Sequence, residues 1–253
     1  MFATMRVEPA YRKLAFEIEA RILDRSLRDG ETLPTEAELC AQFGVNRSTV
    51  REALREMESA GLVTRRRGTK RLVVTRPGAV RIADTVGRAL ALEDVTVLEV
   101  WESLHLVAAP AAAHGARRRT AADLAAIEAA FQRFTDDSAD TTRALVHMQA
   151  FFRAVIRASG NRVLMLTLEP LLRLMEPTLA AMLQAAPQAR VRVRTAQRRI
   201  ADAIHARDVE TARTWMSRYL RDFRRGYEVA GVALDQRVLW RASTRQTGAT
   251  LPV

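Results

Sequence analysis

The sequence has very little cysteine: Cys40 is the single one among 253 residues. One thiol cannot close a disulfide within the chain, which agrees with a reducing compartment. Cys40 lies between Leu39 and Ala41 on an expected helix. This position favours a small buried side chain over a redox-sensitive one.

Long uninterrupted apolar segments are also missing. The most apolar stretch, residues 98–113, contains Glu99, Glu102 and His105, so it falls short of the roughly 18 apolar residues that suggest a membrane-spanning helix. The first ten residues lack the apolar core of a signal peptide. We therefore expect no membrane-spanning helix and a cytoplasmic location.

Residue sets that support catalysis are lacking as well. The chain shows no Ser/His/Asp or Cys/His set, no glycine-rich phosphate loop and no carboxylate pair converging on one face. We therefore expect a binding protein and not an enzyme. An all-helical enzyme with an appended basic domain is the rival from a different class.

Positive charge, by contrast, is in excess. Lys and Arg number 40 against 29 Asp and Glu, a formal net charge of +11. Such a surplus favours a polyanionic partner, either nucleic acid or an anionic membrane surface. The length and the 48% apolar content suffice for two globular domains.

The N-terminal region has the pattern of a helix-turn-helix. A first helix is predicted over residues 11–28. Thr35 followed by Glu38 is a capping box that starts a short second helix, and Gly44 ends it. A third helix is expected to run to about Ala60.

The third helix is amphipathic. Its apolar residues at helical spacing face the core: Val50, Ala53, Leu54 and Met57. Its outward residues are Arg47, Ser48, Arg51 and Arg55. Guanidinium groups can bridge O6 and N7 of guanine, and hydroxyl groups can hold phosphates. This face therefore suits the DNA major groove, with an ordinary solvated face as the alternative.

A basic hairpin follows the third helix. Residues 61–64 and 72–74 are predicted as strands, and the turn between them is rich in arginine. Six positive charges lie between Arg65 and Arg76 with no carboxylate among them. A hairpin of this kind can contact the DNA backbone or minor groove as a wing.

Three motifs of this region resemble the winged helix-turn-helix of the GntR family. They are Leu33-Pro34-Thr35-Glu36, Gly44-Val45-Asn46-Arg47-Ser48-Thr49-Val50-Arg51-Glu52-Ala53-Leu54, and Gly61-Leu62. The resemblance implies DNA contacts by Arg47, Ser48, Thr49, Arg51, Arg67 and Gly68. The chain departs from the family at Ala37, where a basic residue is common, and at Lys70, which replaces the second glycine of the wing turn.

The sequence pattern changes after Arg76-Pro77-Gly78, because strand patterns end there and helical periodicity follows. This tripeptide is the predicted domain boundary. Helical periodicity is expected over residues 80–91, 95–115, 121–135, 139–159, 161–184, 188–206 and 208–228. Pro170, Pro177 and Pro187 would start, kink or separate helices, so the helix boundaries within residues 161–187 stay open. The fold class is thus mainly α: a winged helix-turn-helix domain (9–76), then an all-α antiparallel helical-bundle effector and dimerisation domain (80–229). Residues 230–253 are expected to be a mobile tail, with one or two further turns of helix over residues 232–240 as the alternative.

The helical order resembles FadR-type sensors, and three motifs carry this resemblance: Leu98-Glu99-Val100, Ala158-Ser159-Gly160-Asn161 and Ile200-Ala201-Asp202-Ala203-Ile204. Many of these sensors hold a divalent metal with one Asp and three His. The matching positions here are Met148, Phe152, Gln197 and Tyr219. Such a site needs oxygen or imidazole donors, so the resemblance implies no metal and no cofactor. Trp101 stands where the family commonly has an effector-binding arginine. A metal site rebuilt from the four histidines is the less favoured alternative.

A cavity lined by Trp101, Met148, Phe152, Gln197 and Tyr219 would be largely apolar. The expected effector has an apolar body, such as an acyl chain, an aromatic acid or a CoA ester. A bundle simply filled by these side chains is an equal alternative.

A single winged helix-turn-helix reads few base pairs, so we expect a homodimer on a palindromic operator in double-stranded DNA. The resemblance implies a repressor that a small molecule controls. A ligand-independent DNA-binding protein and a metal-dependent carboxylate sensor are the alternatives.

Overall fold

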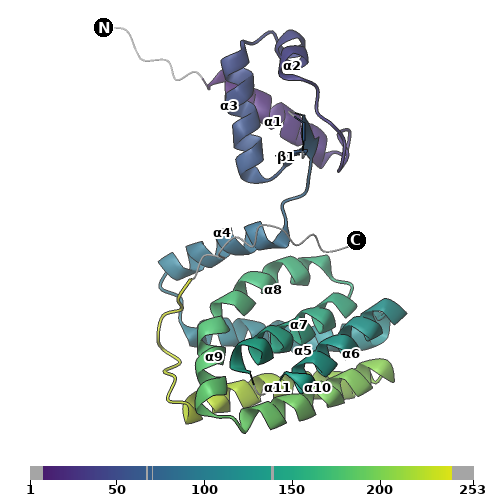
Figure 1. The fold of residues 1–253 in the computed structure, drawn as a ribbon, viewed down its shortest axis with the longest axis vertical. Coiled ribbons are helices and arrows are strands. Elements are labelled where there is room, and N and C mark those ends of the chain that lie inside the picture. The colour runs from purple at the N-terminus through teal and green to yellow at the C-terminus, as the bar shows by residue number, and fades with distance from the viewer. Residues whose placement is uncertain (1–7, 67, 70, 138–139, 241–253) are drawn as a thin grey trace. The chain divides into compact units, whose positions relative to one another are not determined.

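The computed structural model describes residues 8–66, 68–69, 71–137 and 140–240. The chain divides into two compact units, and the boundary between them in the sequence lies between Arg81 and Ile82. This is a few residues after the predicted boundary. Each unit has its own hydrophobic core. Figure 1 shows the elements of both units.

The N-terminal unit is a winged helix-turn-helix. Its elements are α1 (Ala10–Leu23), α2 (Glu36–Phe43), α3 (Arg47–Ala60), β1 (Val63–Arg65) and β2 (Leu72–Val74). The two strands pair antiparallel with Thr64 opposite Val73. The predicted order of helices and strands is confirmed.

Capping groups set the ends of α2 and α3. The Thr35 side chain accepts a hydrogen bond from the Glu38 amide, and the Glu38 carboxylate accepts one from the Thr35 amide, which completes the predicted capping box. Gly44 and Gly61 end α2 and α3 with left-handed φ angles of 63° and 79°. A residue with a Cβ atom adopts this conformation only at a cost, which explains glycine at both ends.

The core of this unit lies between α1, α3 and the strands. The buried residues include Leu14 and Ile18 of α1 and all four apolar residues predicted on α3: Val50, Ala53, Leu54 and Met57. Cys40 is half-buried against the same core. This packing leaves the polar side of α3 exposed.

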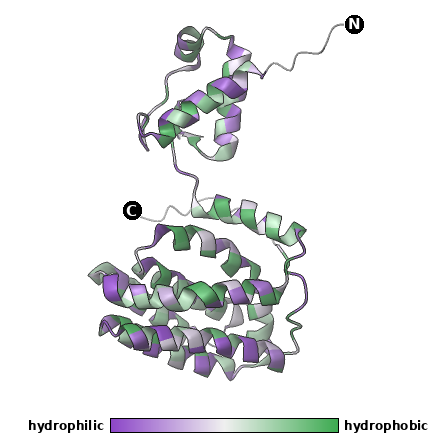
Figure 2. Ribbon diagram, turned by 180° about the vertical axis from the view of Figure 1, so that it is seen from behind, coloured by the Kyte–Doolittle hydropathy of each residue, from purple (hydrophilic) through white to green (hydrophobic). Residues whose placement is uncertain are grey.

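The second unit is all-helical. Its helices are α4 (Ala79–Leu92), α5 (Val97–Arg118), α6 (Ala121–Asp136), α7 (Thr141–Ala158), α8 (Arg162–Leu174), α9 (Glu176–Ala185), α10 (Ala189–His205) and α11 (Val209–Val229). α5 packs along α11, and α6 packs along α7. Figure 2 shows hydrophobic and hydrophilic residues mixed along these helices, as expected for helices with one buried side. Among the described residues, no helix is both long and apolar enough to cross a membrane.

The single helix predicted over residues 161–184 is wrong, because the structure has two helices, α8 and α9, there. Met175 ends α8 and also precedes the first residue of α9. Pro177 lies in the first turn of α9. Proline has no amide hydrogen to continue the ladder of α8, but it is tolerated where a new helix starts.

Residues 230–240, the first part of the expected mobile tail, form backbone hydrogen bonds with the residues at the start of α5. The Val97 amide donates to Gln236 O at 3.0 Å, and the Val238 amide donates to Val95 O at 2.8 Å. Val238 is only 5% exposed. This segment therefore pairs with the start of α5 and forms no further helix. The remainder of the expected tail, residues 241–253, lies outside the described residues.

Candidate nucleic-acid interface and helical-bundle cavity

The first candidate site is the polar side of α3 and its N-terminus. Asn46 caps the helix: its Oδ1 atom accepts hydrogen bonds from the Ser48 hydroxyl at 2.7 Å and from the Thr49 amide at 2.9 Å. Arg47, Ser48 and Arg51 are exposed, and Thr49 is half-buried. The four predicted contact residues of α3 thus lie in its first two turns, where the helix dipole also favours an anion.

The wing supplies the remaining predicted residues. Gly68 is exposed and has a left-handed φ of 77°, which suits a tight turn between β1 and β2. Arg67 lies outside the described residues, as does Lys70. Gly68 is thus the predicted wing residue that the structure places.

A groove with a volume of about 480 Å³ lies between the start of α2, the side of α3 and the two strands. Four arginines line it: Arg51, Arg55, Arg65 and Arg71. Arg51 Nε is 2.9 Å from Glu36 Oε2, and Arg65 Nε is 3.4 Å from Glu58 Oε1. Arg55 and Arg71 form no ion pair with any described residue. We define these four residues and the concavity as the arginine groove.

Arg55 was predicted on the outward face of the third helix, and Arg65 and Arg71 on the basic wing, but none of the three is among the residues whose DNA contacts the family resemblance implies. A signal for Arg55 was present, because it follows Arg51 by four residues and shares its helix face. Arg65 and Arg71 belong to the basic wing, but their approach to α3 depends on strand pairing. Guanidinium groups on such a concave surface can bind phosphate oxygens bidentately.

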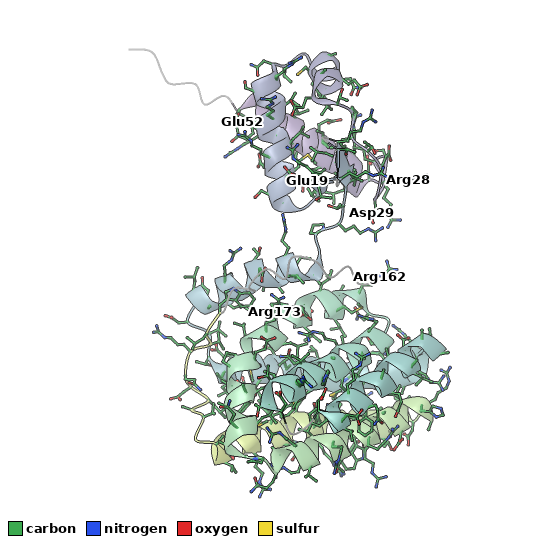
Figure 3. All side chains as sticks on the ribbon, viewed as in Figure 1. Glu19, Arg28, Asp29, Glu52, Arg162 and Arg173 are labelled. Carbon is green, nitrogen blue, oxygen red and sulfur yellow. The ribbon has the colours of Figure 1, made fainter. Side chains whose placement is uncertain are left out.

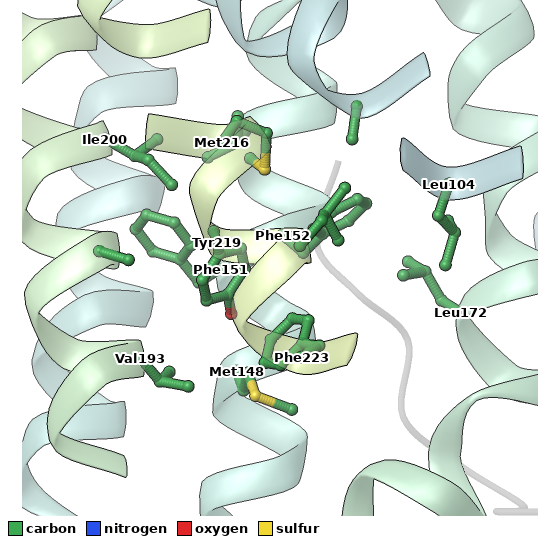
Figure 4. Close-up of a cluster of buried hydrophobic side chains, with 14 of the residues drawn as sticks. Leu104, Met148, Phe151, Phe152, Leu172, Val193, Ile200, Met216, Tyr219 and Phe223 are labelled. Carbon is green, nitrogen blue, oxygen red and sulfur yellow. The ribbon is translucent and has the colours of Figure 1, made fainter. Parts of the chain in front are cut away.

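The second candidate site lies inside the helical unit. Trp101, Met148, Phe152 and Tyr219 line one small cavity. Gln197 is not part of its wall, but its Nε2 atom donates to the Tyr219 hydroxyl at 3.2 Å. All five side chains are buried, and Figure 4 shows the cluster around Tyr219. The structure thus brings the five predicted residues together.

The cavity is small, about 30 Å³, which is room for roughly one or two water molecules. The side chains that line it are Trp101, Leu104, Met148, Gln149, Phe152, Leu172, Met175, Leu179, Tyr219, Leu220, Phe223 and Tyr227. Sequence reasoning missed the residues of α8 and α9, because it used family positions on α5, α7, α10 and α11. In this conformation the side chains fill most of the space that an effector would need.

The four family ligand positions do not fit a divalent metal. They offer a thioether, a phenyl ring, an amide and a phenol, and burial raises the pKa of Tyr219, which keeps that phenol protonated. Within the described ranges, no group of three or more His, Cys, Asp or Glu residues could hold an ion. Of the histidines, His105 stacks on Trp101 with centroids 5.0 Å apart, and His147 Nε2 pairs with Asp137 Oδ2 at 3.0 Å.

A charged network includes Arg173, which directly follows the cavity residue Leu172 in the sequence. Arg153 binds Glu169 with two hydrogen bonds of 2.8 and 2.9 Å. Arg173, labelled in Figure 3, lies 3.7 Å from Glu169 and 2.7 Å from Asp84. The network thus links α7, α8 and α4.

Together these features define a class: a winged helix-turn-helix protein with an all-helical second domain. The family model described as "Bacterial regulatory proteins, gntR family" matches residues 10–73, and the FCD domain model matches residues 99–222. The chain belongs to the GntR family of DNA-binding transcriptional regulators and has an FCD domain as its second unit.

Two curated relatives come from Escherichia coli K12. The putative L-lactate dehydrogenase operon regulatory protein is 26% identical over 82% of this chain and 82% of its own length. The Glc operon transcriptional activator is 28% identical over 66% of this chain and 67% of its own length. A solved structure named Streptococcus agalactiae GntR has the same fold, with a TM-score of 0.62 at 22% identity, over 85% of this chain and 99% of that one.

Proposed function

We propose that this protein is a homodimeric repressor that binds a palindromic operator and is controlled by a small molecule in its FCD domain. The observation that supports DNA binding best is the polar side of α3 beside the arginine groove. The exposed groups there suit base edges and phosphates. We assign base reading to Arg47 and Arg51, and phosphate contacts to Ser48, Thr49, Arg67 and Gly68.

The dimer follows from the size of the DNA-binding unit. One helix in the major groove reads few base pairs, whereas two copies on an inverted repeat reach useful specificity. An activator is the second candidate, because one relative is named as the activator of the Glc operon.

The test of this function is a selection from random duplex DNA with the full-length protein. We expect an enriched inverted repeat, bound by two chains per duplex in sedimentation measurements. A reporter gene behind that repeat then distinguishes repression from activation. Binding without sequence preference would instead indicate a general DNA-binding protein.

We further propose that the effector occupies the cavity at Trp101, Met148, Phe152, Gln197 and Tyr219, without a metal. Support comes from four buried side chains that line one apolar space and from the buried Gln197, which donates a hydrogen bond to the Tyr219 hydroxyl behind it. Native mass spectrometry of the purified protein tests this assignment. A metal-free dimer with an organic adduct supports it, and one zinc or nickel ion per chain contradicts it.

A further inference from the structure

The wall of the bundle cavity has no ionisable charge. Of the described residues that line it, none is Asp, Glu, Lys, Arg or His. Arg224 lies over the Trp101 ring at 5.3 Å but is not part of the wall. An ionised carboxylate in this space would therefore lose its hydration without gaining a cation from the lining residues, which is costly.

Most polar groups of the wall are already engaged. Trp101 Nε1 donates to Leu220 O at 2.8 Å, and Gln149 Nε2 donates to Leu172 O at 3.1 Å. These bonds hold α5 to α11 and α7 to α8, so neither donor is free for a ligand.

The Tyr227 hydroxyl differs from these engaged polar groups of the cavity wall. Its side chain lines the cavity and is fully buried, yet no group of the described residues lies at ordinary hydrogen-bond distance from its hydroxyl oxygen. Burial raises the pKa of this phenol, and an interaction of its hydroxyl with the Thr178 side chain, which itself donates to Met175 O at 3.0 Å, offsets only part of the rise. The hydroxyl therefore stays protonated and can donate a hydrogen bond. A buried donor without an acceptor is rare in proteins and calls for an explanation.

We infer that the effector is an uncharged molecule with an apolar body and one carbonyl oxygen that accepts a hydrogen bond from Tyr227. Esters, thioesters, amides and ketones meet this description, whereas free carboxylates do not. The inference rests on the proposed effector site and narrows the ligand class within it.

Binding requires the cavity to open. Its volume is about 30 Å³, whereas an apolar cavity that holds benzene measures about 150 Å³. Met148 and Met175 form part of the wall, and methionine side chains adapt readily to new shapes. Movement of these two side chains is the simplest way to admit an aromatic or acyl body.

The test compares matched probes: methyl benzoate with benzoate, and methyl octanoate with octanoate. Each is titrated into the full-length protein at pH 8, with calorimetry and tryptophan fluorescence as readouts. We expect each ester to bind about a hundredfold more tightly than its acid, because the acid must bury a charge. Equal or tighter binding of the acids overturns the inference, and so does binding of neither member.

Tyr227→Phe is the matched variant, because it removes only the hydroxyl group. It should weaken ester binding about fivefold, the value of one hydrogen bond, and leave binding of ethylbenzene unchanged. Circular dichroism verifies the fold. Unchanged ester affinity overturns the role of Tyr227. Operator binding is measured separately and without probes, so that failure of the DNA-binding function is distinguishable from failure of this inference.

Discussion

Arg173 Nη1 lies 2.7 Å from Asp84 Oδ1 and joins the last turn of α8 to α4. The same turn supplies Leu172, and Met175 follows directly; both line the bundle cavity. A change in the cavity wall therefore acts on the same turn that holds α4. This arrangement offers a direct structural route from the effector site to the beginning of the helical unit.

Asp84→Asn should lower the free energy of unfolding of the helical unit by about 1 kcal/mol, because a partly buried, charge-assisted hydrogen bond is lost. The side chains of Arg173 and Asp84 are 16% and 31% exposed. Urea unfolding followed by circular dichroism measures the change. Hydrogen exchange should also become faster in the α4 peptide.

The matched control is Glu128→Gln, which breaks the more exposed pair of Glu128 with Arg198. Exposed pairs contribute little, so the loss should stay below about 0.5 kcal/mol. Equal effects of the two variants, or unchanged exchange in α4, would contradict a special role for Arg173 and Asp84.

Arg55→Ala should weaken operator binding about tenfold, or ~1.4 kcal/mol, and make the affinity less dependent on salt. The reason is the exposed, unpaired guanidinium in the arginine groove. Fluorescence anisotropy at several salt concentrations gives both values. Arg21→Ala on α1 removes an exposed arginine outside the groove, and a similar loss in that variant would refute the groove as the phosphate-binding surface.

Gly87→Ala should displace the C-terminal segment from α4. A Cβ atom at Gly87 would overlap the Trp240 ring. The overlap is relieved most easily by moving the indole, so we expect red-shifted tryptophan emission and a loss of about 1 kcal/mol. Gly78→Ala is the control, because nothing lies within 4 Å of its Cβ position. The same spectrum in both variants would show that Trp240 does not depend on Gly87.

Local signals explain which parts of the fold were predictable. The capping pair Thr35 and Glu38 and the helix stop at Gly44 act within a few residues, and the structure confirms them. The end of α8 was harder to predict, because apolar periodicity continues through Met175 into α9, although Pro177 is a local signal for the start of a new helix. Residues 232–240 lack periodicity, and their order depends on backbone pairing with residues 95–98.

The candidate sites also contain residues that local spacing predicts and residues that depend on tertiary structure. The exposed side of α3 follows from helical spacing, so Arg47, Ser48 and Arg51 could be selected from the sequence. The arginine groove requires Arg65 and Arg71 of the paired strands to meet α3. The volume of the cavity is even harder to predict from the sequence, because it depends on the rotamers of many side chains from several helices.

Removal of divalent metal ions by a chelator should change neither the thermal stability of the protein nor its affinity for the operator. Met148, Phe152, Gln197 and Tyr219 offer no strong ligand for a divalent ion, so metal cannot contribute to stability there. We expect dialysis against EDTA to alter neither Tm nor operator affinity, and added zinc or nickel not to raise Tm. Elemental analysis of the protein as purified provides the independent measurement. One ion per chain, lost on chelation together with several degrees of Tm, would mean that other side chains bind a metal and that the effector is a carboxylate bound to it.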